Sequence, residues 1–66
     1  MKYFILNMMN ELDADGIDFY IYNNKKIILS FTKNEIQEDS NDKIKFPFMP
    51  CFFWKNINGH KVKIIY

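Results

Sequence analysis

The fold is decided by residues 51–66, which read CFFWKNINGHKVKIIY. Two runs of aromatic and β-branched residues flank the dipeptide Asn58-Gly59 in this stretch. Asn-Gly accepts the positive φ angles of a two-residue type I′ turn, whose twist matches that of the flanking strands. The turn predicts a β-hairpin in one register: Ile57 with His60, Lys55 with Val62, Phe53 with Ile64 and Cys51 with Tyr66 on one face, and Asn56 with Lys61, Trp54 with Lys63 and Phe52 with Ile65 on the other.

The two faces of this hairpin differ in character. The face that holds Phe53 is the more apolar, so we expect it to contribute to the core. On the other face, Trp54 opposite Lys63 is a candidate cation–π pair. The residues expected in the core are Phe53, Val62, Ile64 and Tyr66.

A second hairpin is predicted over residues 17–32, where the polar residues 23–26 separate two apolar, alternating runs. Its register depends on the turn. A two-residue loop would pair Phe19 with Ile28, whereas a four-residue loop would pair Ile21 with Ile28. Because a slip of one residue exchanges the two faces, the sequence leaves both registers open.

Before the hairpins, apolar residues recur at the i, i+3, i+4, i+7 spacing of a helix with one apolar face. Gly16 fits the position that ends such a helix in a left-handed conformation. A strand over residues 2–6 is the alternative, because Tyr3-Phe4-Ile5 also favours strands. The helical positions are Ile5, Met8, Met9 and Leu12.

Between the hairpins, Thr32 and Glu35 have the spacing of a capping box. We expect residues 33–42 to form a short helical turn followed by an exposed, acidic loop. Residues 43–48 alternate again and predict a further strand, which Pro47 confines to an edge because proline lacks a backbone N–H. Its apolar side holds Ile44, Phe46 and Phe48.

Together these elements predict one α+β domain spanning residues 1–66, with one N-terminal helix packed on a small antiparallel sheet built from two β-hairpins plus one extra strand. A chain of 66 residues buries only about 60% of its unfolded surface, so we expect modest stability and a core rich in aromatic residues.

Charge is unevenly distributed. Residues 1–42 hold four lysines and eight carboxylates, and residues 43–66 hold five lysines and no carboxylate. The halves can attract each other within the fold, or the basic half can form a surface for an acidic partner. Cys51 is the only cysteine, so no internal disulfide is possible and a reducing, cytoplasmic location is expected. The apolar N-terminal run is too short to span a membrane.

No catalytic or metal-binding signature is present. His60 is predicted to be a solvated turn residue and Cys51 a small buried hydrophobe. The two would lie at opposite ends of one hairpin, too far apart for a nucleophile pair, and they lack the partners of a zinc site. Asp13, Asp15 and Asp18 lack the spacing and final Glu of a calcium loop. We therefore expect no enzymatic activity, no cofactor and no metal.

Aromatic and basic residues also interleave in the second half, a pattern found in proteins that bind single-stranded nucleic acid. We expect no such binding, because the core needs the aromatic residues, arginine is absent and the net charge is near zero. The residues concerned are Phe46, Phe48, Phe52, Phe53 and Trp54, with Lys43, Lys45, Lys55, Lys61 and Lys63.

The first half has a recognisable order: a helix bearing Met8, Met9 and Leu12, the step Gly16-Ile17, and two strands around a polar turn. In this order residues 4–32 resemble the β-hairpin-type N-terminal docking domains of nonribosomal peptide synthetases. The resemblance stops there, since that family continues into helices and residues 43–66 predict strands. It implies a non-enzymatic domain that receives the C-terminal linear tail of another subunit by β-strand addition and so orders the subunits. We expect the domain to be a monomer.

The strand over residues 27–32, with lysines at both ends, is the candidate edge for that tail. The predicted partner-binding residues are Lys25, Lys26, Ile28, Ser30, Thr32 and Lys33. The alternative is a free-standing inhibitor or accessory protein, for example one encoded by a phage, that blocks a larger enzyme. Its small size and aromatic content suit that function as well.

Overall fold

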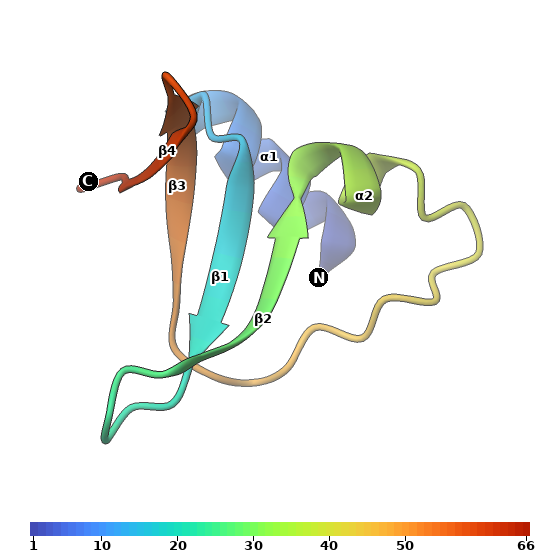
Figure 1. Cartoon of the computed structure of the whole chain (residues 1–66). Helices are drawn as coiled ribbons and strands as arrows, with labels where there is room; N and C mark the ends of the chain where they lie inside the picture. Colours follow the sequence, from blue (N-terminus) through green and yellow to red (C-terminus); the bar gives the residue numbers. More distant parts are fainter.

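The structure is a computed structural model that describes residues 1–66. Four strands form one antiparallel sheet in the order β2-β1-β3-β4, and both helices lie on one face of it (Figure 1). The predicted α+β class is confirmed. The elements are α1 (Lys2–Leu12), β1 (Gly16–Tyr20), β2 (Ile27–Thr32), α2 (Lys33–Gln37), β3 (Cys51–Ile57) and β4 (His60–Lys63).

The N-terminal helix forms as the apolar spacing predicts, and a strand over residues 2–6 is excluded. Ile5 and Met9 are buried on the sheet, while Met8 and Leu12 pack at the edges of the core. The helix ends earlier than predicted, because Asp13 rather than Gly16 takes the left-handed conformation, with φ 54° and ψ 43°. Gly16 instead begins β1.

The core lies between the helices and the sheet. Ile17 and Phe19 of β1 face it together with Phe53 of β3. From the helices come Ile5, Met9 and Ile36, the last of which is completely buried and lies in the predicted helical turn. Thr32 and Glu35 form the predicted capping box, and this turns the chain so that Ile36 points inward.

The first hairpin adopts neither predicted register throughout. Tyr20 pairs with Ile27, as a two-residue loop requires, but a β-bulge then shifts the pairing so that Phe19 lies opposite Leu29. The bulge restores the alternation that places Ile17, Phe19 and Phe31 on the core side. Asp18 and Ser30 therefore share the opposite face.

The second hairpin has the register that Asn58-Gly59 predicts from Ile57 opposite His60 to Trp54 opposite Lys63. The strand ends at Lys63, so the pairs predicted for residues 64–66 are not part of the sheet. Asn58 and Gly59 have φ angles of 52° and 81°, as a type I′ turn requires. Two of the predicted core residues are wrong, since Val62 is 43% and Tyr66 72% exposed. Strand β4 is the outermost strand on that side and pairs only with β3.

The predicted cation–π pair of Trp54 and Lys63 is displaced by one rung. Lys61 lies over the Trp54 ring at 4.7 Å, and Lys63 lies over Phe52 at 5.2 Å. The diagonal contact forms because the ammonium of Lys61 also pairs with Asp18, which lies beyond Trp54.

The extra strand predicted over residues 43–48 does not form. This segment is irregular and joins α2 to β3 across the end of the helix-covered face (Figure 1). Backbone N–H groups of Lys43 and Ile44 bind the Asp39 carboxylate instead of a neighbouring strand. Phe46 packs on Phe19 and Phe31 in the core, but the alternation breaks at Pro47 and the Phe48 side chain is fully exposed.

Neither helix has the length and apolar character needed to cross a membrane.

Candidate functional site

Strand β2 is an edge of the sheet, because only β1 pairs with it. All its residues except Phe31 are exposed. Lys33, which follows the strand, donates its backbone N–H to the Asp15 carbonyl at 2.8 Å. Since bonded and non-bonded pairs alternate in an antiparallel ladder, Asp18 and Ser30 form a non-bonded pair. The N–H and C=O of Ser30 therefore point away from β1, toward solvent.

The two other predicted contact positions on β2 have fewer backbone groups free to pair with an added strand. Ile28 lies at the bulge, where the ladder is irregular. Thr32 is the N-cap of α2: its Oγ1 accepts the Glu35 N–H at 3.1 Å, and its own N–H binds Glu35 Oε1 at 2.9 Å. Hydrogen bonds from the backbone N–H and the side chain of Thr32 lower the pKa of the Glu35 carboxyl. Ser30 is thus the best-placed residue for main-chain pairing.

The three predicted lysines lie where the sequence placed them, at the two ends of β2. Lys25 has a positive φ of 59° and extends its ammonium over Tyr20 and Tyr22, at 5.4 and 4.8 Å from the ring centroids. Lys26 is exposed beside it, and Lys33 is the first residue of α2. No carboxylate occurs within β2 itself.

Charge in this fold separates by layer. The four strands and their turns hold five lysines and one carboxylate, whereas the helices and remaining connections hold four lysines and seven carboxylates. Ion pairs also join the two halves of the chain, as one interpretation of the sequence predicted. Lys55 binds Asp13 at 2.8 Å, which lowers the pKa of that carboxyl and raises that of the lysine.

The one carboxylate of the sheet, Asp18, is completely buried on the face without helices. Its oxygens accept bonds from Ser30 Oγ at 2.6 Å, Trp54 Nε1 at 2.8 Å and Lys61 Nζ at 3.0 and 3.3 Å. Three different strands therefore converge on one side chain of the central strand β1. A fully paired buried charge fixes which residues face one another, since shifting any strand would leave it unpaired.

Gly16 makes room for this cluster. A Cβ atom built at Gly16 would lie 2.0 Å from Cζ2 of Trp54, so the indole occupies the space that a side chain would need. The ring lies across the glycine and directs its N–H at Asp18. Sequence reasoning missed this cluster. The available signal was a carboxylate within an otherwise apolar strand, two residues after a glycine.

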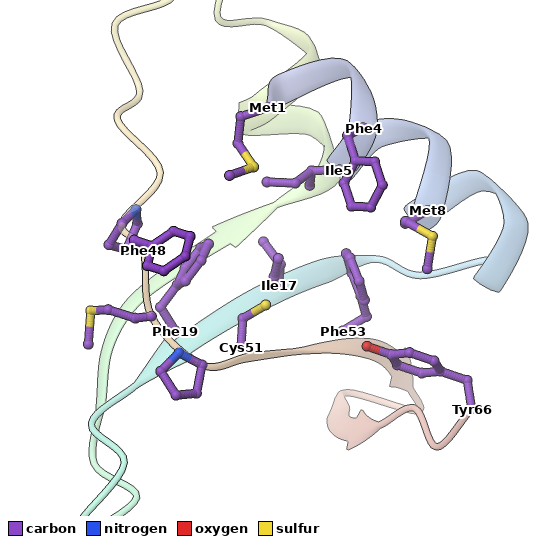
Figure 2. Close-up of a pocket in the computed structure, with 13 residues that line it drawn as sticks. Met1, Phe4, Ile5, Met8, Ile17, Phe19, Phe48, Cys51, Phe53 and Tyr66 are labelled. Carbon is purple, nitrogen blue, oxygen red and sulfur yellow. The ribbon is translucent and has the colours of Figure 1, made fainter.

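A second surface is an apolar groove of about 500 Å³ on the helix-covered side. Figure 2 shows Phe4, Ile5 and Met8 of α1 facing Cys51 and Phe53 of β3 across it, with Phe48 at one end and Tyr66 at the other. None of the side chains that line it is charged. The sequence did not predict it, because its lining comes from α1, residues 47–50 and β3, which only the folded chain brings together.

Cys51 lies in this groove and is exposed rather than buried as predicted. Its apolar surroundings still raise the pKa of the thiol. His60, at the hairpin turn, is exposed as the sequence suggested. The structure contains no group of three or more His, Cys, Asp or Glu side chains that could hold a metal ion.

Comparisons of this chain with protein-family models, with curated proteins and with solved structures found no match.

Proposed function

We propose that this domain is a non-enzymatic interaction module that binds an extended, acidic segment of a partner protein as an additional strand beside β2. One observation carries the proposal: β2 is an open edge with lysines at both ends and no carboxylate of its own. Main-chain bonds would supply affinity, and the lysines would select the partner by charge.

The same charges disfavour pairing between two copies of the domain. An antiparallel contact of β2 with its own copy would bring Lys25 and Lys26 of one molecule near Lys33 of the other. Like charges opposed in this way weaken association, as edge-strand lysines commonly do. The edge therefore suits a monomer that receives a different chain.

The resemblance of residues 4–32 to synthetase docking domains supports a more specific proposal. On that basis the partner is the C-terminal tail of another nonribosomal peptide synthetase subunit, and binding orders the subunits. The lone cysteine supports a reducing, cytoplasmic setting. Because a linear tail loses conformational freedom on binding, we expect a dissociation constant of roughly micromolar size.

The test is an NMR titration of the isotope-labelled domain with an acidic peptide. Reversal of two lysines, Lys25→Glu with Lys26→Glu, should weaken binding roughly tenfold, since it changes rim electrostatics by about 1–2 kcal/mol. The matched control reverses Lys43 and Lys45, which lie in the connection before β3. If both pairs of reversals lower the affinity for the peptide equally, the β2 edge does not select the peptide.

The apolar groove supports a second candidate function, an accessory protein that covers an apolar segment of a larger enzyme. The observation in its favour is the gathering of exposed Phe4, Phe48 and Tyr66 around one hollow (Figure 2). Large exposed apolar patches commonly mark interaction surfaces. Phe48→Ser removes a fully exposed ring, so it should leave the fold intact. If this second function is correct, the variant should no longer bind the apolar partner segment.

A further inference from the structure

We infer that the added strand carries a carboxylate, preferably Glu, at the residue opposite Ser30, where the ammonium of Lys61 meets it. This inference rests on the proposed function and specifies its partner.

The register follows from the unequal supply of backbone groups along β2. Ser30 presents both its N–H and its C=O outward, while the Thr32 N–H is bound by Glu35 and the ladder at Ile28 is bulged. A strand added here forms its most regular pairing at Ser30. In both antiparallel and parallel pairing, the residue opposite Ser30 places its side chain on the same face as the serine.

That face carries the buried Asp18 cluster. Lys61 Nζ lies 3.3 Å from Ser30 Oγ, and its side chain remains 41% exposed. Opposed side chains on neighbouring strands have Cβ atoms about 4.5–5.5 Å apart, within reach of a glutamate carboxylate for this ammonium. Lys61 is thus presented by β4 at the edge of β2, although two strands separate them in the sheet.

The charge at this point favours an anion. The Asp18 carboxylate is enclosed, with its two oxygens already accepting bonds from three side chains. The Lys61 ammonium is the part of the pair that faces solvent. Lys25 and Lys26 at one end of β2 and Lys33 at the other add positive charge and no compensating carboxylate lies on the strand.

The residues that flank this glutamate point to the other face, because side chains alternate along a strand. There they meet Leu29, which is exposed, and Phe31, whose ring lies 5.8 Å from that of Phe46. Apolar side chains suit these positions. The partner segment that the edge fits is therefore an apolar–Glu–apolar triplet in extended conformation.

Two seven-residue peptides test this inference, one with a central Glu between two valines and threonine elsewhere, and one with Gln in place of Glu. NMR titration of the whole domain should give roughly fivefold tighter binding for the Glu peptide, the size expected of one partly exposed charge pair. A third peptide, with Glu exchanged for a neighbouring Val, should lose that advantage. Equal affinity of all three peptides would overturn the inference.

A variant tests the role of Lys61. Asp18→Asn combined with Lys61→Met removes both charges without leaving one buried alone, and should reduce the Glu to Gln preference to about one while Ser30 still responds. Lys63→Met, the next lysine along β4, should keep the preference. Persistence of the preference in the double variant would overturn the inference; should that variant not fold, the peptide comparison still decides it. If no peptide perturbs β2, the proposed function itself fails.

Discussion

Gly16→Ala should strongly destabilise the fold, although it adds only one methyl group. In a Gly16→Ala variant the new methyl group would lie 2.0, 2.3 and 2.7 Å from three atoms of the Trp54 indole. The ring cannot turn aside easily, because it is buried and its Nε1 donates to the enclosed Asp18 carboxylate at 2.8 Å. Overpacking a core costs about 1–3 kcal/mol, and loss of a hydrogen bond to a charged group about 1.5–3 kcal/mol.

We expect Gly16→Ala to lower the free energy of unfolding by about 3 kcal/mol. A domain of this size is stabilised by roughly 3–10 kcal/mol in total, so the variant loses a large share of it. The midpoint of thermal unfolding should fall by roughly 12–20 °C, measured by circular dichroism. Trp54 fluorescence in urea gives a second measurement of the same difference.

Gly59→Ala is the matched control. Gly59 has a positive φ of 81° but no atom within 4 Å of the built Cβ, so only backbone strain of about 1 kcal/mol applies. Trp54→Leu combined with Gly16→Ala should be more stable than the two separate losses predict, because the smaller side chain leaves room for the methyl group. If Gly16→Ala unfolds at the wild-type temperature, or the two losses simply add, the account of Trp54 is wrong.

Three further predictions concern the second turn, the carboxyl groups and the thiol. Gly59→Val should destabilise the domain more than Gly59→Ala, because a β-branched residue is strained at positive φ, and an unchanged melting temperature would exclude the type I′ turn. Hydrogen bonds lower the pKa of Glu35 and Asp39 from ordinary values of 4.5 and 3.8. The two carboxylates should therefore stabilise the folded domain fully at neutral pH, and this stabilisation should decline as the pH falls below about 4. Thr32→Ala should reduce the acid sensitivity in melting curves recorded from pH 2 to 8. Cys51 is exposed, but its partly apolar surroundings raise the pKa of its thiol above the ordinary value of 9.0. Alkylation of Cys51 by iodoacetamide should therefore be slower at pH 7 than alkylation of a free thiol, and its rate should still rise above pH 9. A rate that levels off near pH 7 would contradict this.

Local chemistry explains what the sequence predicted correctly. The Asn58-Gly59 turn sets the register of β3 and β4 without help from the rest of the chain, and the helical spacing of Ile5 and Met9 likewise needs no tertiary information. The capping box at Thr32 is equally local. The strand over residues 27–32 was a candidate edge, but the sheet order that makes it one follows from the folded chain.

Tertiary packing explains what the sequence did not reveal. The bulge in β2 aligns Ser30 with Asp18, and only the assembled sheet brings Lys61 to both. Residues 43–48 have strand-like alternation, but the N–H groups of Lys43 and Ile44 bind the Asp39 carboxylate and Pro47 has no N–H to offer a ladder. The groove is lined by residues of α1, residues 47–50 and β3, whose association no local sequence pattern specifies.

Strand addition at β2 can be measured by hydrogen exchange at the Ser30 amide. In the free domain this N–H points to solvent at the edge of β2, so it should exchange rapidly, whereas the amide of Phe31 should be protected by the ladder with β1. Addition of the Glu-centred peptide should protect Ser30 and leave the groove residues Phe4 and Phe48 unchanged. A Ser30 amide that exchanges at the same rate with and without saturating peptide, while the groove residues respond, would contradict strand addition at β2.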